Sequence, residues 1–231
     1  MKFLKKLFLF ILIVVLLIGS VIFLNGYKLY KNTIQNLSLS DKIKEIKSED
    51  SYVSIKDVPD YYINAIIAVE DHRFRDHGAI DIISIGRAIV SNIKAKDFNE
   101  GGSTITQQVA KNLYFITEDD VISRKIAEIL VGIDLEKNYS KDDILEFYIN
   151  TIYFGEGYYG IKEASNGYYD KEPKDLTLYE ATLLAGVPNA PSVYAPTVNP
   201  DLAKSRQEKV ISSMIEHGYL SKEEANNILN K

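Results

Sequence analysis

Residues 7–24 read LFLFILIVVLLIGSVIFL, an apolar run of 18 residues without a charged side chain. A helix of this length spans about 27 Å, close to the roughly 30 Å hydrocarbon core of a bilayer. A cleaved signal peptide would have a shorter apolar region, about 7–15 residues, that ends at a small-x-small site. We find no convincing site before Asn25. We therefore predict an uncleaved membrane anchor.

Basic residues flank this run on both sides, so the charge distribution indicates its orientation only weakly. Lys2, Lys5 and Lys6 precede it, and Lys28 and Lys31 follow it. The lysines and the amino terminus favour a cytoplasmic N-terminus, which places the C-terminal part on the extracytoplasmic face. The whole chain has 27 basic and 32 acidic residues, but residues 1–31 carry +5, so the remaining 200 residues carry −10. This acidic excess argues against a nucleic-acid partner.

The chain divides into four parts by composition. Residues 1–6 form a basic cytoplasmic flank, 7–24 the anchor, 25–56 a stalk and 57–231 one domain. Residues 32–56 are polar and weakly patterned, which is why we expect a stalk there. About 200 residues suit one domain. The absence of cysteine excludes disulfides, thiolate zinc sites and a cysteine nucleophile.

Helical signals dominate residues 57–231. Asp57 and Pro59 are a good N-cap and first-turn pair, and apolar residues recur at helical spacing in 81–94, 104–115 and 121–137. Capping boxes open three later helices, at Ser140 with Asp143, Thr177 with Glu180, and Ser221 with Glu224. Long alternating strands are missing from the sequence. We predict a mainly α domain of about eight to ten helices.

Polar residues follow an apolar helix at 68–79 (AVEDHRFRDHGA). The helix delivers Glu70 and Asp71 to its end, where partial burial of Glu70 would raise its pKa towards that of a general base. The simpler alternative is a solvated helix end paired with Arg73 and Arg75. The two histidines of this segment are five residues apart, outside the i, i+4 spacing of two metal ligands on one helix face.

A Gly-Gly turn leads into a helix at 100–114 (EGGSTITQQVAKNLY). Ser103 or Thr104 caps the helix, and its free backbone amides and positive dipole end would receive an anion such as phosphate. Gln107, Gln108 and Lys111 add amides and a cation. Such a turn is common and by itself weak evidence, and the nucleotide-binding string G-x-x-x-x-G-K-[ST] is missing.

Arg124, Lys125 and Glu128 lie at i, i+3 and i, i+4 spacing on the next helix. Pairs of this kind usually decorate a helix surface and contribute about 0.2–0.5 kcal/mol without any function. Together the three clusters supply two carboxylates, several cations and an anion-receptive helix start. This combination suits transfer of a sugar from a diphosphate.

Five stretches resemble the peptidoglycan glycosyltransferases, glycosyltransferase family 51, in their monofunctional membrane-anchored form. They cover most of residues 57–220 and comprise EDHRFRDHGAID (70–81), GGSTITQQVAKNLY (101–114), RKIAE (124–128), KDDILEFYINTIYFG (141–155) and LTLYEATLLAGVPNAPSVYAP (176–196). The second and the last are long and specific. The resemblance implies a lysozyme-like multi-helix domain on a bacterial cell membrane. It also implies an inverting reaction that polymerises lipid II into β-1,4 glycan and releases polyprenyl diphosphate.

The resemblance also implies a role for each matched residue. Glu70 would be the general base, Asp71 its support and Glu128 a second catalytic carboxylate that organises the diphosphate. A divalent ion such as magnesium would reach Glu128 through the diphosphate, and no organic cofactor is implied. The substrate-binding positions would be Ser103, Thr104, Gln107, Gln108, Lys111, Asn112, Arg124, Lys125, Phe74 and His77. We expect the basic and amide residues on a membrane-facing cleft, with the acids opposite. The implied partners are lipid II, the growing glycan, membrane lipid and other cell-wall synthesis proteins.

The sequence departs from the family pattern at two turns. His77 is followed by Gly78 and Ala79 where the family usually has His-x-Gly, and residues 168–171 read YYDK where it often has Tyr-Phe-Gly-Lys. Two rival functions stay open, a lysozyme-type glycan hydrolase and an inactive membrane-tethered glycan-binding module. A transpeptidase domain is not expected, because the one S-x-x-K string, at 91–94, has neither S-x-N nor K-T-G beside it.

Overall fold

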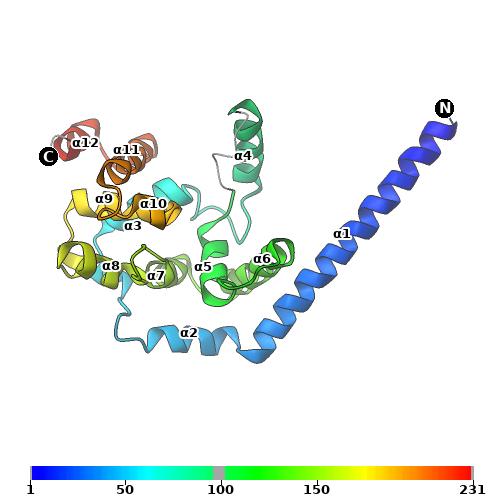
Figure 1. Cartoon of the computed structure of the whole chain (residues 1–231), viewed down its shortest axis with the longest axis horizontal. Coiled ribbons are helices and arrows are strands. Elements are labelled where there is room, and N and C mark those ends of the chain that lie inside the picture. The colour runs from blue at the N-terminus through cyan, green and yellow to red at the C-terminus, as the bar shows by residue number, and fades with distance from the viewer. Residues whose placement is uncertain (1, 96–101, 230–231) are drawn as a thin grey trace.

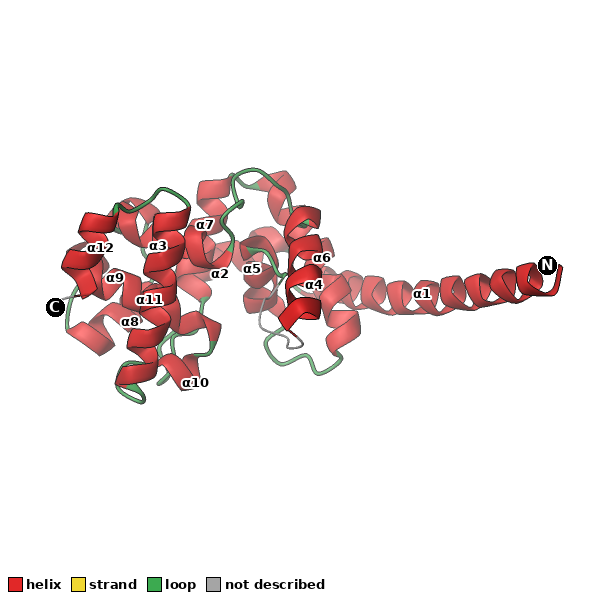
Figure 2. Cartoon of the chain, turned by 90° about the horizontal axis from the view of Figure 1, so that it is seen from above, coloured by secondary structure: helices red, strands yellow, loops and turns green. Residues whose placement is uncertain are grey.

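The computed structural model describes residues 2–95 and 102–229 and consists of helices joined by short loops (Figure 1). Gly101, which we placed in the Gly-Gly turn, lies outside the described residues. No strand is present in the described ranges, where one isolated bridge joins Tyr153 and Tyr159 (Figure 2). The helices are α1 (Lys2–Asn36), α2 (Leu39–Lys47), α3 (Asp60–Glu70), α4 (Ile82–Ala95), α5 (Ile105–Tyr114), α6 (Val121–Asn138), α7 (Lys141–Thr151), α8 (Gly160–Tyr169), α9 (Leu178–Gly186), α10 (Pro191–Tyr194), α11 (Pro200–Glu216) and α12 (Lys222–Leu229).

The mainly α prediction is confirmed, and its local signals are largely correct. Ten α-helices, α3 to α12, fall within the described part of 57–231. The Ser140 and Thr177 capping boxes are present, and Ser221 and Glu224 make the reciprocal bonds of the third. One cap is wrong. Asp57 belongs to a short 3-10 helix (Ile55–Asp57), and Pro59 is the N-cap of α3.

The segment expected to be a stalk packs against the domain. Residues 25–36 continue α1, and α2 buries Leu39, Ile43 and Ile46 in the same core as the domain. These three residues repeat at i, i+4 and i+7, which is the stripe of an amphipathic helix. The lysines and acids between them lowered the mean hydropathy and concealed the stripe. The other domain limits stay predictions.

Two groups of helices make up the domain. In one, α3 packs against α9 and α11, and in the other, α5 packs against α6 and α7. The core runs through both, with Tyr62 and Ile66 of α3 and Phe147 and Tyr148 of α7 fully buried. Since α3 ends at Glu70 and α5 begins at Ile105, the candidate residues lie where the two groups meet.

The long helix α1 is apolar enough to cross a membrane at its N-terminal end and packs against α6 at its C-terminal end. Its apolar window has a mean hydropathy of 3.4 and is 0% buried. Gly26 allows the contact with α6, because a Cβ at this position would lie 2.5 Å from Ile126 Cβ and 3.0 Å from the Ser123 carbonyl oxygen. Tyr30 Oη adds a hydrogen bond of 2.6 Å to Asp134 Oδ2.

Gly26→Leu is expected to destabilise the full chain, because the leucine side chain must force α1 away from α6. Overpacking of this kind costs about 1–3 kcal/mol, which lowers the melting temperature by about 2–10 °C in a protein of this size. The measurement is thermal unfolding in detergent micelles. Gly19→Leu is the matched control, since no atom of the described residues outside the local helix lies within 4 Å of a Cβ there. Equal melting temperatures for the two variants would contradict the contact.

Candidate active site

A cleft of about 1040 Å³ lies where the two helix groups meet. Its walls come from the end of α3, from α5 and α6, from residues 151–159 and from α11. Ten of the thirteen residues that we predicted as site residues line it: Glu70, Asp71, Ser103, Gln107, Gln108, Lys111, Asn112, Arg124, Lys125 and Glu128. The structure therefore brings all three polar clusters of the sequence into one cavity.

Glu70, the last residue of α3, has one carboxylate oxygen that accepts a hydrogen bond and one that accepts none from the described residues. Its side chain is 11% exposed, and Oε2 accepts a hydrogen bond of 2.9 Å from Gln108 Nε2. Oε1 is buried, accepts no hydrogen bond from residues 2–95 or 102–229, and lies 3.7 Å from Arg206 Nη2. Oε1 therefore has no donor to its lone pairs within the described residues, on a side chain that lines the cleft, and an unpaired carboxylate oxygen is the kind of group that can act as a proton acceptor.

Burial raises the pKa of Glu70 above its ordinary value. The hydrogen bond from Gln108 and the positive charge of Arg206 act in the opposite direction, and the neighbouring Asp71 raises the pKa again. The net direction is upward, because the apolar surroundings disfavour the ionised carboxylate more than its two partners favour it. This places Glu70 closer to the pKa range of an effective general base at neutral pH.

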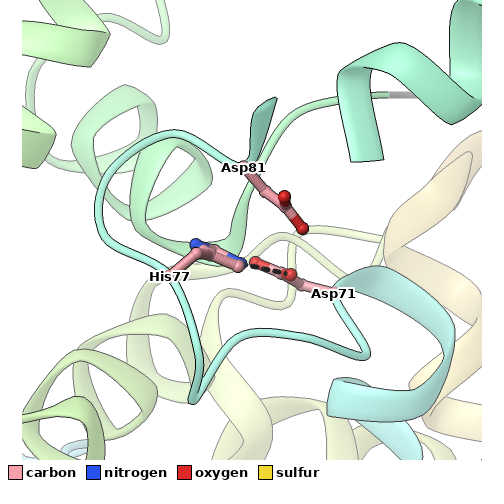
Figure 3. A group of neighbouring side chains, drawn as sticks. All are labelled: Asp71, His77 and Asp81. Atoms are coloured by element: carbon pink, nitrogen blue, oxygen red, sulfur yellow. Dashed lines mark hydrogen bonds and ion pairs between the residues drawn. The ribbon is translucent and has the colours of Figure 1, made fainter. Parts of the chain in front are cut away.

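Asp71 joins three parts of the site (Figure 3). Its Oδ1 lies 2.7 Å from His77 Nε2, and its Oδ2 accepts a hydrogen bond of 3.0 Å from the backbone amide of Ile105, the first residue of α5. Burial raises the pKa of Asp71, and the contacts with His77 and Ile105 act against that rise. Asp71 thus fixes the start of α5 relative to the end of α3, which holds Gln108 beside Glu70.

Asp71, His77 and Asp81 approach one another closely enough to raise the question of a metal ion (Figure 3). Asp81 Oδ1 accepts from the amides of Ile83 and Ser84, and its Oδ2 accepts from Arg73 Nε and Ser84 Oγ. Burial opposes the ionisation of Asp81, but these donors outweigh it and hold its pKa well below the usual range. All four carboxylate oxygens of the pair already have protein donors, so the cluster fits a structural network better than a metal site.

Glu128 is held between two cations on α6. Its Oε1 lies 3.2 Å from Arg124 Nε and its Oε2 lies 3.1 Å from Lys125 Nζ, and Lys125 Nζ also donates to Ser103 Oγ at 2.8 Å. A divalent cation prefers several free oxygen ligands, whereas Glu128 offers one carboxylate whose oxygens already face positive charges. These residues do not fit a magnesium ion held by the protein. They fit a site that receives an anion.

The charge of the cleft is opposite to that of the chain around it. Four acidic and six basic side chains line it, whereas residues 32–231 carry a net charge of −10. The lining acids are Glu70, Asp71, Glu128 and Glu216, and the basic residues are Arg87, Lys111, Arg124, Lys125, Arg206 and Lys209. The cations therefore gather in the cleft of an acidic domain, which favours an anionic ligand.

Three predicted substrate-binding residues lie behind the cleft wall. Phe74 is fully buried in the core, where it packs against other apolar side chains, and its role towards substrate stays a prediction. His77 contacts Asp71, and Thr104 caps α5 by accepting from the Gln107 amide while it donates to the Ala79 carbonyl oxygen. The sequence motif identified these three residues, but it did not show that their side chains contact neighbouring residues behind the cleft wall.

Both departures from the family pattern have a local explanation. Ala79 does not adopt a positive φ, so the backbone of the turn does not require a glycine there. A Cβ added to Gly132 of α6 would lie 3.2 Å from the Cβ of Ala79, so the absence of a side chain at Gly132 leaves room for the alanine. Asp170 has φ 53° and ends α8 in the left-handed conformation, where glycine is favoured and Asp is tolerated.

Arg206 is the functional candidate that sequence analysis missed. It lies on α11, outside the five matching stretches, and approaches Glu70 only because α11 packs against α3. The spacing along the chain gives no signal for a contact between residues 70 and 206. Tyr148, which lies inside the matching stretch 141–155 but was not singled out, is a second polar residue near Glu70; its Oη is buried and makes no hydrogen bond in the described part of the chain.

Comparison with known proteins gives one family and a set of longer relatives. A family model described as Transglycosylase matches residues 38–215. Penicillin-binding protein 1F of Bacillus subtilis (strain 168) is 45% identical over 236 residues, which cover 96% of this chain and 33% of the relative. Penicillin-binding protein 1A of Aquifex aeolicus (strain VF5) is 43% identical over 180 residues, which cover 78% of this chain and 25% of the relative.

Among solved structures, penicillin-binding protein 1A from Haemophilus influenzae matches with 24% sequence identity and a TM-score of 0.47. The match covers 78% of this chain and 17% of that chain. The chain thus spans a third or less of the length of the relatives it matches.

Proposed function

Because the chain belongs to the transglycosylase family, we propose that it is a peptidoglycan glycosyltransferase that polymerises lipid II from the extracytoplasmic face of a bacterial membrane. The observation that carries the proposal is the carboxylate of Glu70, whose buried Oε1 accepts no hydrogen bond from the described residues, in a cleft whose walls are net positive. A base and an anion site in one cavity are what this transfer needs.

In the proposed reaction Glu70 acts on the acceptor sugar. The carboxylate of Glu70 takes the proton from the 4-hydroxyl of lipid II while that oxygen attacks C1 of the growing chain. One C–O bond forms as the bond between C1 and the diphosphate breaks, with inversion at C1, and the electron pair leaves with the polyprenyl diphosphate. Glu70 then returns its proton to solvent, ready for the next addition.

The cations of α5 and α6 act on the leaving group. Lys111, Arg124 and Lys125 line the cleft and would offset the charge that builds on the diphosphate. Glu128 holds Arg124 and Lys125 in place through its two ion pairs. Because the oxygens of Glu128 face these cations, we assign the neutralisation of the diphosphate charge to Lys111, Arg124 and Lys125. Magnesium has no step in the proposed reaction.

The proposal is tested by incubating the full chain in micelles with labelled lipid II, in magnesium and in EDTA. We expect long glycan strands in both. Cleavage of finished glycan with lipid II left intact would favour the hydrolase, and no reaction with either would favour the binding module. Strands in magnesium but none in EDTA would contradict the assignment of leaving-group charge to Lys111, Arg124 and Lys125.

The pH dependence of the reaction should report the raised pKa of Glu70. A general base works only when ionised, so kcat/KM should fall as the pH drops through that pKa, at a pH above the ordinary value of about 4.3. Gln108→Leu removes a hydrogen bond that favours the ionised form, so it should move this acidic limb to higher pH. The measurement is initial rate against pH.

Asn112→Leu is the matched control for this shift. Asn112 lies one turn further along α5 in the same cleft, and its amide nitrogen makes no hydrogen bond within the described residues. The variant should leave the acidic limb in place whatever it does to the rate. If Gln108→Leu left the acidic limb unmoved, Glu70 would not be the group whose protonation lowers kcat/KM.

A further inference from the structure

Residues 152–160, between α7 and α8, form a tight hairpin in the wall of the cleft. An antiparallel bridge pairs Tyr153 with Tyr159, and the Phe154 amide donates to the Tyr158 carbonyl oxygen at 2.9 Å. Side chains of residues directly opposite each other in such a pair project from the same face. The two tyrosine rings accordingly lie side by side, with centroids 4.7 Å apart and an angle of 36° between their planes. Both residues line the cleft.

The hairpin is fixed to the rest of the domain at its tip. Gly155 has a φ of 86°, and a Cβ there would lie 3.1 Å from the Pro191 carbonyl oxygen, so the turn lies directly against α10. Glu156 Oε2 accepts a hydrogen bond of 2.5 Å from Thr197 Oγ1. The tyrosine pair is therefore held in place before any ligand arrives, which lowers the entropy lost on binding.

The two rings are exposed in an uncharged part of the cleft. Tyr153 is 36% exposed and Tyr159 is 48% exposed. Among the described residues, the lining side chains from 151–159 and 188–191 are two tyrosines, two prolines, an isoleucine, a threonine and an asparagine. The charged lining residues belong to other segments, at the C-terminal end of α3 and on α4, α5, α6 and α11. This wall therefore suits an uncharged ligand that has an apolar face and several hydroxyl or amide groups.

We propose that Tyr153 and Tyr159 form a platform on which a sugar ring of the glycan strand stacks, beyond the ring that reacts at Glu70. The C–H bonds on one face of a β-linked hexose carry a slight positive charge, which the negative face of an aromatic ring attracts. The hydroxyl and acetamido groups at the rim of the sugar match the Thr151 hydroxyl and the Asn189 amide of the same wall. The inference rests on the proposed function, because it takes the glycan strand as the polymer made in this cleft.

A sugar fits this wall better than the diphosphate of the substrate does. The diphosphate finds its cations elsewhere in the cleft, at Lys111, Arg124 and Lys125. Each sugar of a strand can stack in turn, as successive bases do on the aromatic platforms of proteins that bind single-stranded nucleic acid. The platform would thus keep a growing strand in the cleft between additions.

The test uses a tetramer of β-1,4-linked N-acetylglucosamine, which has the linkage of the proposed product but no lipid, peptide or diphosphate. Its affinity for the full chain in micelles is measured by saturation-transfer NMR. We expect the tetramer to bind to the parent chain. Tyr159→Leu keeps an apolar side chain but removes one aromatic face, so it should weaken binding by about 2- to 10-fold. Tyr159→Phe keeps the ring and should bind as the parent does.

Lys111→Met is the matched control at a charged position of the same cleft. The tetramer has no charge, so this variant should keep the affinity of the parent. The platform would be rejected if the parent did not bind the tetramer, if Tyr159→Leu bound it equally well, or if Lys111→Met lost as much affinity as Tyr159→Leu. Equal losses in Tyr159→Leu and Tyr159→Phe would assign the contact to the hydroxyl and overturn stacking. Melting temperatures of the variants show whether a loss reflects misfolding, and Tyr153→Leu then repeats the test from the other ring.

Polymerisation of labelled lipid II gives a second measurement. Tyr159→Leu should release strands that are shorter by about twofold or more, because its strand leaves the cleft sooner. Strands of parental length would overturn the proposed retention.

The two proposals fail separately. A chain that binds the tetramer through Tyr159 but does not polymerise lipid II would reject the proposed function and keep the platform. Polymerisation by a chain that does not bind the tetramer would reject the platform and keep the proposed function.

Discussion

Glu70→Gln is expected to reduce the rate of lipid II polymerisation by about 10²- to 10⁴-fold, the usual contribution of a general base. The amide keeps the size of the side chain, but it cannot act as a base. The measurement is the initial rate of strand formation by purified full chain. The loss should appear in kcat, since in the proposed reaction the 4-hydroxyl loses its proton in the transition state.

The same substitution should not weaken the fold. A carboxyl group whose pKa is raised in the folded protein binds its proton more tightly there, so its ionisation at neutral pH lowers stability. A neutral amide avoids that loss, and the melting temperature of Glu70→Gln at pH 7 should equal or exceed that of the parent chain. Inactivity combined with a lower melting temperature would point to misfolding.

Glu216→Gln is the control for position and charge. Glu216 is the last residue of α11 and another carboxylate of the same cleft. This variant should keep its rate within a few-fold of the parent chain. If both variants lost activity equally, the effect would belong to the charge of the cleft, and Glu70 would have no special part in it.

Lys111→Met is expected to lower kcat/KM by about 10²- to 10³-fold, the cost of removing one group that stabilises charge in a transition state. Arg124 and Lys125 are tied to Glu128, whereas Lys111 has no ion pair within residues 2–95 and 102–229. Its charge is therefore available to the diphosphate. Since Lys111 is exposed and its side chain makes no ion pair in the described part of the chain, the melting temperature should stay unchanged.

Lys137→Met provides the comparison for Lys111→Met. Lys137 is an exposed lysine in the last turn of α6 and does not line the cleft. Its removal changes the net charge equally and should leave kcat/KM unchanged. A full rate in Lys111→Met would assign the diphosphate to other cations, and a similar loss in both variants would reflect the overall charge of the domain.

The residues that sequence analysis placed correctly are those fixed by their chain neighbours. A capping box such as that of Ser140 and Asp143 is complete within four residues, so its geometry follows from the sequence. The three polar clusters were also visible, because each occupies one helix end or one helix face. Their meeting in one cleft came from the family resemblance, and spacing along the chain did not predict it.

The residues that sequence analysis missed depend on packing between distant segments. Arg206 approaches Glu70 across 136 positions, and no local pattern marks that contact. The burial of Phe74 and the docking of α2 are similar cases, since each depends on which surface the rest of the fold presents. Motifs identified the residues of the site, but only the structure separated those that face the cleft from those that hold the others in place.

The unbroken course of α1 from its apolar run to its contact with α6 has a consequence for how the protein moves. If α1 crosses the membrane as proposed, a flexible tether would let the domain tumble above the bilayer, whereas a helix that packs against α6 at Gly26 and Tyr30 restricts the domain mainly to diffusion in the plane and rotation about the membrane normal. The cleft then stays at a fixed distance from the membrane surface. A molecule whose lipid tail lies in the same bilayer also keeps its headgroup at a fixed height. The two molecules then need only the same position in the membrane plane and the right relative orientation to meet.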